Sequence, residues 1–389
     1  MFFLFSGDIE AKPEEILMKC KNNFQIDLNF SINFVYLTKR HYISADFYPY
    51  FTLLGQSLGS IGLAFEAIFK CVPNVMIDSM GYAFIFPIFK YLGDSRVGAY
   101  VHYPTISTDM LSMVSKTVST YNNRSFISNS RLLTTAKLFY YKLFALLYGV
   151  IGRTSDVVMV NSSWTQQHIQ EIWKCRAHRV YPPCNTNQFK ALSLQNKNNL
   201  QIVSIGQIRP EKNHSLQLKA FKEFVQRLTA GGKSSDSAKL VIIGSCRNTE
   251  DEQRVEELRR LCQTLKVEER VEFKLNISFE ELKRVIQESS IGLHTMINEH
   301  FGIGVVECLA AGLITVAHDS GGPKIDIIDN GVNGFLATDF VSFAETLEKI
   351  VNLDEKQLNE IRIKSRESVD RFSELQFEKL FLKYIEIIL

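Results

Sequence analysis

Two acidic side chains flank a glycine-containing loop late in the chain, and no other stretch gathers so many residues suited to chemistry. Residues 298–312 read NEHFGIGVVECLAAG, with Glu299 before the loop and Glu307 beyond it. Glycines let a ligand approach the backbone closely, and a helix starting at about Ile303 presents unpaired N–H groups and a partial positive charge. The pattern predicts an anion at the loop, with hydroxyl groups donating to the carboxylates.

A phosphate between two polyols, as in a nucleotide sugar, fits this spacing of Glu299 and Glu307. The alternative is that two surface acids flank an ordinary helix start, and this window alone leaves both interpretations open.

A second loop, residues 206–214 (GQIRPEKNH), follows a predicted strand and opens a helix. It lacks the G-x-G-x-x-G fingerprint, and no acid follows at the distance that would bind a ribose, which argues against a dinucleotide cofactor. It offers Arg209 and Lys212 instead. Two cations and a helix end that stabilise a leaving diphosphate could lower a barrier by several kcal/mol, on the order of a thousandfold in rate.

His102 is the third candidate. It follows the predicted strand 97–101 and precedes Tyr103 and Pro104. Ligand crevices of open α/β sheets lie at the carboxyl ends of strands, which favours a functional histidine over a core histidine.

The sequence predicts neither a metal nor another cofactor, because it has no Asp-x-Asp pair and no His/Cys cluster. Asp326 and Asp329 are expected on a solvated helix face. Residues 320–323 (SGGP) are expected to form either a wall of the same cleft or a tight turn.

Length and composition restrict the class of protein. The chain has 389 residues, 46% of them hydrophobic, which is enough for two cores. The chain has 44 Lys and Arg residues against 42 Asp and Glu residues, a balance that argues against a nucleic-acid partner.

Seven cysteines without a C-x-x-C pair fit a reducing compartment. Asn161, Asn213 and Asn276 could accept glycans but lie where folding or binding needs them, which favours the cytosolic side.

The most lipid-like stretch is residues 131–152, RLLTTAKLFYYKLFALLYGVIG. Lys137 and Lys142 interrupt it, so it is expected to be an interfacial or core helix rather than a membrane span. Whether it lies on a membrane or inside the domain stays open. No signal peptide is visible at the start of the sequence.

The second half alternates apolar strands with helices, which predicts a parallel, doubly wound, Rossmann-like sheet. Its predicted strands are 201–206, 239–244, 271–274, 290–294 and 313–317, and its predicted helices are 214–228, 249–265, 279–288 and 303–311. The first half is expected to be a looser version of the same fold. The predicted organisation is a front domain over 1–184, a linker over 185–200, a nucleotide-sugar-binding domain over 201–370, and a C-terminal helix over 371–389 that returns to the front domain.

Taken together, these residues resemble the retaining glycosyltransferases of the two-domain GT-B kind that carry an E-x7-E motif. More narrowly, residues 77–84, 100–110 and 294–312 are similar to the eukaryotic α-1,2-mannosyltransferases that extend the dolichol-linked oligosaccharide. The resemblance implies two Rossmann-like domains with a cleft between them.

The resemblance also implies substrates, partners and a location. The donor would be GDP-mannose, and the acceptor dolichyl-diphosphate-linked Man3GlcNAc2, extended by its fourth and fifth mannoses in the pathway of protein N-glycosylation. The place would be the cytosolic face of the endoplasmic reticulum membrane, with the membrane surface and other glycosyltransferases of the pathway as partners.

Roles for individual residues follow from the same resemblance. Arg209 and Lys212 would grip the donor diphosphate, Glu299 would contact the mannose hydroxyls and Glu307 the ribose, and His102 would reach the sugar from the front domain. The loop amides would complete the phosphate site; the loop residues are Phe301, Gly302, Ile303 and Gly304. Retention would follow a front-face path in which the departing phosphate takes the acceptor proton.

One departure from the family pattern concerns the beginning of the chain. Such enzymes begin with a membrane anchor, a first strand and a glycine-rich loop, and nothing before Gly7 is glycine-rich. The front domain is therefore expected to be N-terminally truncated. The alternative function is a catalytically impaired form that binds a nucleotide sugar or partner proteins without turnover. A phosphorylase-like enzyme would need a pyridoxal lysine, for which there is no signature.

Overall fold

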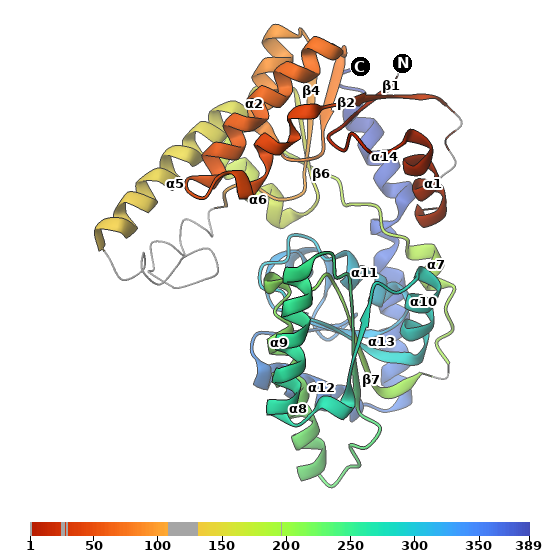
Figure 1. Cartoon of the computed structure of the whole chain (residues 1–389). Helices are drawn as coiled ribbons and strands as arrows, with labels where there is room; N and C mark the ends of the chain where they lie inside the picture. Colours follow the sequence, from red (N-terminus) through yellow and green to blue (C-terminus); the bar gives the residue numbers. More distant parts are fainter. Residues whose placement is uncertain (1, 25–27, 29, 108–130, 196) are drawn as a thin grey trace. The chain divides into compact units, whose positions relative to one another are not determined.

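The computed structural model describes residues 2–24, 28, 30–107, 131–195 and 197–389. Residues 108–110, the end of one motif quoted above, lie outside these ranges. The chain divides into two compact units (Figure 1). The first comprises Met1–Asn161, Thr165–Val180 and Phe381–Leu389, and the second Ser162–Trp164 and Tyr181–Leu380.

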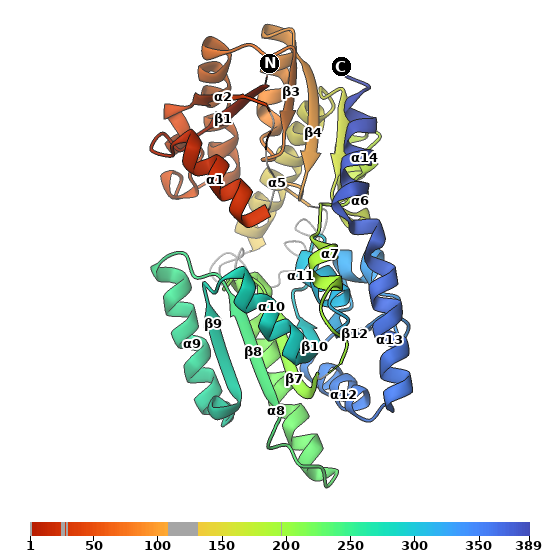
Figure 2. The same ribbon diagram turned by 90° about the vertical axis from the view of Figure 1, so that its right-hand side faces the viewer.

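The second unit is built on one parallel sheet with the strand order β12-β11-β10-β7-β8-β9 (Figure 2). Its strands are β7 (Asn198–Ile205), β8 (Lys239–Gly244), β9 (Val271–Leu275), β10 (Ser289–His294), β11 (Ile314–His318) and β12 (Phe335–Ala337). The prediction of a parallel Rossmann-like sheet is confirmed. The short strand β12 was not predicted.

Successive side chains of the central strands alternate between the two faces of the sheet, so the core of this unit consists of two clusters. On β8, Leu240 and Ile242 belong to the cluster that includes Leu218 of the helix α8, whereas Val241 and Ile243 belong to the cluster that includes Val305. Successive side chains of a strand point to opposite faces, so a continuous apolar strand needs helices on both sides.

Local capping explains where several helices of this unit begin. Asn248 accepts a hydrogen bond from the Asp251 amide at 3.0 Å, and Asp339 and Asp354 each form a capping box. The helices are α7 (Thr186–Lys190), α8 (His214–Ala230), α9 (Thr249–Leu265), α10 (Phe279–Glu288), α11 (Ile303–Ala310), α12 (Phe340–Val351) and α13 (Glu355–Ser368).

The polar stretch predicted as a linker, residues 185–200, differs from that expectation. The chain already enters the second unit at Tyr181, and the stretch contains α7 and the first residues of β7. The Asn185 side chain accepts from the Gln188 amide at 3.4 Å, and Phe189 is completely buried. The polar composition of this stretch gave no indication that Phe189 is part of the core.

The first unit contains two separate parallel sheets, β1-β2 and β3-β4-β5-β6, where a single looser sheet was expected. The strands are β1 (Phe2–Ser6), β2 (Ile32–Tyr36), β3 (Val75–Asp78), β4 (Arg96–Val101), β5 (Val157–Val160) and β6 (His178–Arg179). The helices that belong to it are α1 (Pro13–Phe24), α2 (Thr52–Lys70), α5 (Arg131–Gly152) and most of α6 (Ser163–Trp173).

The end of the chain packs on the larger of these sheets. The helix α14 (Glu374–Ile385) crosses from the second unit into the first at Phe381. The Phe381 ring lies 6.2 Å from Tyr100, and the Tyr384 ring stacks on His178 at 4.1 Å. A side chain at Gly98 would meet Ile388 at 3.1 Å, so the glycine leaves room for this segment.

Helix α2 is, among the described residues, the one helix long and apolar enough to cross a membrane by length and composition. A third of that window, 33%, is buried inside the protein. Its Glu66 accepts hydrogen bonds from the amides of Thr38 and Lys39 at 2.8 and 2.9 Å and pairs with Lys70 at 2.7 Å. Burial opposes ionisation, but these contacts lower the pKa of Glu66 to about 2.

Candidate active site

The centre of the site is the carboxylate of Glu299, which lies in the loop after β10. Lys212, at the end of a short 3-10 turn (Pro210–Lys212), forms an ion pair with Glu299 Oε2. His294, the last residue of β10, places Nε2 3.1 Å from the same oxygen. At that distance the ring nitrogen contacts the carboxylate but is not aligned for a hydrogen bond. Glu299 is 7% exposed, so its carboxylate is largely shielded from solvent.

Electrostatics keep Glu299 ionised. Burial alone would raise its pKa, but His294 and Lys212 outweigh that effect and hold the pKa well below its usual range. The carboxylate is therefore an acceptor-only group, suited to hydroxyl donors.

The Thr295 side chain ties the two loops together. The Thr295 hydroxyl donates to the carbonyl oxygens of Lys212 and Asn213 at 3.0 and 3.2 Å. Asn213 adopts a left-handed conformation with φ 53°, which turns the chain into α8. The end of β10 thus fixes the position from which Lys212 reaches Glu299.

The glycine loop opens α11 as predicted from the sequence. Gly302 has φ 112°, a conformation reserved for glycine, and its carbonyl accepts from the amides of Val305 and Val306. Among the described residues, the amides of Ile303 and Gly304 precede these bonds and stay available to a ligand. A side chain at Gly304 would lie 3.1 Å from the carbonyl oxygen of Ile205, so the helix start sits close to β7.

Residues 320–323, for which a wall and a turn were both considered, pack directly on this loop. The Gly322 amide donates to the Glu299 carbonyl at 2.7 Å, and the Ser320 hydroxyl accepts from the Asn298 amide at 2.8 Å. A side chain at Gly321, which has φ 62°, would lie 2.3 Å from the Glu299 carbonyl oxygen. Only glycine permits this close approach.

Arg209 precedes the turn that ends in Lys212. Its guanidinium lies 3.7 Å from Glu211, and its Nε is buried and makes no hydrogen bond within the part of the chain that the structure describes. A buried donor without an acceptor is costly, so an anionic ligand would improve its environment.

Glu307 lies on α11, and its environment differs from that of Glu299. Burial raises the pKa of Glu307 to about 7. The residue keeps some exposure. A carboxyl group of this kind accepts a hydrogen bond when ionised and donates one when protonated.

His102 lies in the first unit, directly after β4, as predicted. Its ring makes an edge contact with Tyr100 at 4.9 Å, and its carbonyl accepts from the Thr165 hydroxyl at 3.4 Å. Although the residue is exposed, partial burial of the ring lowers its pKa, so the neutral imidazole prevails.

The expectation for Asp326 is wrong. This residue is 5% exposed, and its carboxylate accepts from the Ser163 amide and hydroxyl at 2.7 and 2.6 Å and from the Tyr181 hydroxyl at 2.9 Å. Asp329 is exposed, as expected. The sequence did not indicate that Asp326 is buried, because the residues that donate to it are distant in the sequence.

His294 is the residue that the sequence analysis did not select. It sits at the carboxyl end of β10, the same kind of position that drew attention to His102. Applying that criterion to every strand would have found it.

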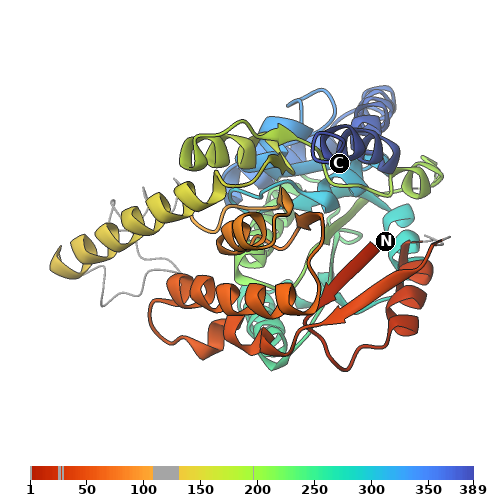
Figure 3. The same ribbon diagram turned by 90° about the horizontal axis from the view of Figure 1, so that it is seen from above.

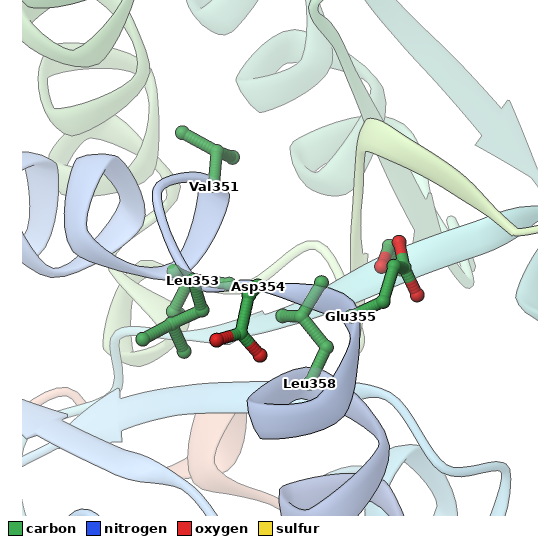
Figure 4. A pocket seen from close by; sticks show the side chains of 7 residues that line it. Val351, Leu353, Asp354, Glu355 and Leu358 are labelled. Carbon is green, nitrogen blue, oxygen red and sulfur yellow. The ribbon is translucent and has the colours of Figure 1, made fainter.

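A separate pocket of about 270 Å³ lies in the second unit between α12 and α13 (Figure 4). Its lining includes Leu353, Asp354, Glu355 and Leu358, together with Ser290 from the opposite end of β10 to His294. None of the predicted site residues lines it.

In the ranges that the structure describes, no group of three or more His, Cys, Asp or Glu side chains could hold a metal ion. All seven cysteines are free.

Comparison with known proteins agrees with this geometry. Residues 1–173 match the family described as ALG11 mannosyltransferase N-terminus, and residues 185–367 match glycosyl transferases group 1. The structure of Anabaena Alr3699/HepE in complex with UDP and glucose superposes with a TM-score of 0.66 at 16% identity, covering 99% of this chain and 98% of that one. The Candida albicans trehalose-6-phosphate phosphatase N-terminal domain superposes with a TM-score of 0.68 at 11% identity, covering 100% and 89%.

The chain is therefore a glycosyltransferase with the GT-B fold. Its sequence is 50% identical to the GDP-Man:Man(3)GlcNAc(2)-PP-Dol alpha-1,2-mannosyltransferase of Homo sapiens, covering 99% of this chain and 80% of that protein. It is 45% identical to the protein of the same name from Dictyostelium discoideum, covering 98% and 77%. The chain belongs to this family of α-1,2-mannosyltransferases.

Proposed function

We propose that this chain transfers mannose from GDP-mannose to dolichyl-diphosphate-linked Man3GlcNAc2, adding the fourth and fifth mannoses in α-1,2 linkage. The proposal is carried by the ion pair between Lys212 and the buried Glu299 beside the glycine loop, in a chain 50% identical to mannosyltransferases of that name. Labelled-mannose transfer to this acceptor tests it.

The donor would lie along the loops of the second unit. Lys212 retains two further ammonium protons beyond the one directed at Glu299, and Arg209 has a buried Nε in need of an acceptor. Both can stabilise the diphosphate, together with the amides of Ile303 and Gly304. Glu299 would accept from mannose hydroxyls, Glu307 from the ribose, and His102 would contact the sugar from the first unit.

Transfer would retain the configuration of the donor. The bond between the mannose anomeric carbon and the diphosphate oxygen breaks, and the acceptor hydroxyl oxygen bonds to that carbon from the same face. The acceptor proton passes to the departing diphosphate, so no nucleophile from the protein is needed. Arg209, Lys212 and the helix end stabilise the charge that develops on the leaving group.

Transfer is expected to be independent of divalent metal ions, because these cationic groups supply the leaving-group stabilisation. Initial rates should be the same with and without excess chelator after exhaustive dialysis. A rate that falls with chelator and returns only with Mg²⁺ or Mn²⁺ would contradict the metal-free scheme.

The proposed location is the cytosolic face of the endoplasmic reticulum membrane. Free cysteines support a reducing compartment. Two of the possible glycan acceptors support it as well: Asn161 is 5% exposed, and the Asn276 amide exchanges two hydrogen bonds of 3.0 Å with the Cys246 backbone. Association with other glycosyltransferases of the pathway stays a prediction.

The proposed membrane contact is an apolar face formed by α2 and α5, two long helices of the first unit (Figure 1 and Figure 3). The two are linked where the Tyr140 hydroxyl accepts from the Leu54 amide at 3.2 Å. Large side chains with exposures of 38% to 87% lie at helical spacing along both; they are Leu58, Phe65, Phe69, Phe139, Leu143, Leu146, Leu147 and Val150.

The charged residues of the two helices favour a membrane as the partner of this face. The sequence of α5 contains Lys137 and Lys142 and no acid, and the one acid of α2, Glu66, is buried and paired. A basic apolar face suits anionic headgroups, and a lipid-linked acceptor would be presented at the same surface.

Phe139→Asp and Leu146→Asp are expected to lower binding to vesicles of phosphatidylcholine with anionic lipid on the order of tenfold, because each places a charge in the apolar layer. Flotation of the full chain measures this. Ile363→Asp, which changes a 50% exposed side chain of α13, is the matched control. Equal vesicle binding by all variants would contradict the assignment of this face.

A further inference from the structure

Asp326 lies close to residues 298–304, called the donor loop below, and has no part in the proposed donor contacts. It belongs to a short helical turn, Pro323–Ile327, that begins directly after Gly321 and Gly322. Its carboxylate is 5% exposed and accepts a 2.6 Å hydrogen bond from the Ser163 hydroxyl. A carboxylate that accepts such short bonds fixes its donors more firmly than a neutral acceptor would.

Two residues that donate to Asp326, Tyr181 and Ser163, connect it to the donor loop. Tyr181 donates to Asp326 at 2.9 Å, and its ring packs on Phe301 at a centroid distance of 5.6 Å. Ser163 is followed by Trp164, which is 8% exposed and packs on His300 at 5.1 Å. His300 and Phe301 directly follow Glu299 in the sequence.

The same loop is held from its other side by the residues that precede Asp326. The Gly322 amide donates to the Glu299 carbonyl at 2.7 Å, and a side chain at Gly322 would lie 2.6 Å from the Phe301 carbonyl oxygen. The turn that carries Asp326 therefore contacts the loop directly through its backbone and indirectly through Tyr181 and Trp164.

Ser163 lies in a three-residue segment that belongs to a different unit from its neighbours in the sequence. Residues 162–164 belong to the second unit, whereas Asn161 and Thr165 on either side belong to the first. Ser163 donates two hydrogen bonds to the Asp326 carboxylate, and these attach the short segment 162–164 to the second unit. Tyr181 is the first residue after the next crossing.

We propose that Asp326 is a positioning residue for the donor loop: through Ser163 and Tyr181 it sets the placement of His300 and Phe301, and so of Glu299, without touching the donor. The identity of the donor in this inference rests on the proposed function, but the positioning of the loop does not.

Two measurements test the inference. Asp326→Asn keeps the shape of the side chain and is expected to raise the KM for GDP-mannose roughly tenfold while leaving the KM for the lipid-linked acceptor unchanged. Amide hydrogen exchange of the free chain is expected to become faster in residues 299–304 and 162–164, with the rest of the second unit unaffected.

Tyr181→Phe removes one donor without a large change in packing, so it provides the test if Asp326→Asn folds poorly. It should raise the donor KM in the same direction by a smaller factor, and the double variant should be no worse than Asp326→Asn alone, because both act through one network. Asp354→Asn, which changes a capping acid of α13 remote from the loop, is the matched control.

Unchanged exchange of residues 299–304 in Asp326→Asn would overturn the inference, as would a lowered melting temperature with an unchanged donor KM. Because hydrogen exchange needs no donor, a chain that fails to use GDP-mannose would refute the proposed function without deciding the role of Asp326, which the exchange result then decides.

Discussion

Lys212→Ala is expected to lower the rate of mannose transfer on the order of a hundredfold, because the ammonium group neutralises charge that develops on the departing diphosphate. The loss should fall on kcat more than on donor binding, since Arg209 and the helix amides remain. Folding should suffer less, because Glu299 keeps His294 and accepts a 3.1 Å hydrogen bond from the His300 amide.

The matched control for this variant is Lys274→Ala. Lys274 is 20% exposed and pairs with Glu272 and Glu281 at 3.0 and 2.9 Å, so it resembles Lys212, which is 22% exposed, in its exposure and in being paired with a carboxylate. If the two variants lose melting temperature and activity in equal proportion, the role of Lys212 is structural and the prediction fails.

Glu299→Gln is expected to slow transfer by about a hundredfold or more, because an amide cannot accept from mannose hydroxyls as a carboxylate does, and it leaves Lys212 without its counter-charge. Glu299→Ala should lose at least as much activity. Both variants should lose more in turnover than in folding. Steady-state rates together with thermal unfolding measure the two effects.

The pH dependence of the transfer rate provides a second test of the role of Glu299. A carboxyl group whose folded pKa is depressed contributes its stability above the unfolded pKa and loses it as the pH falls through the folded value. Glu299 therefore stays ionised at neutral pH, and the ratio of wild-type to variant rates should be constant between about pH 6 and about pH 8. Glu66→Gln, at another buried and paired carboxylate, is the control for folding.

Much of the second unit could be predicted from the sequence because its local signals agree with its packing. The predicted bounds of β8, α9 and α10 are those of the structure. Asn248 and Ser278 cap the two helices, and β8 is apolar on both faces. The strand β12 has three residues, too few for a periodicity to show.

The parts of the candidate site that are formed by residues close in the sequence could be predicted. The parts that depend on contacts between residues far apart in the sequence could not. Glu299 and its glycine loop form one continuous stretch, so their pattern was visible. Asp326 looked like part of a solvated face because its donors Ser163 and Tyr181 lie 163 and 145 positions away. His294 ends β10, and its neighbours in the sequence do not show that its ring contacts the Glu299 carboxylate.

The most direct test of the proposed function is transfer from GDP-[³H]mannose to dolichyl-diphosphate-linked Man3GlcNAc2 by the full chain in vesicles, with Lys212→Ala and Glu299→Gln as comparisons. We expect a labelled product longer by two mannoses, from which an α-1,2-mannosidase releases the label, and almost no product with either variant. Binding of GDP-mannose without product, or a product formed equally well by both variants, would contradict the proposed function.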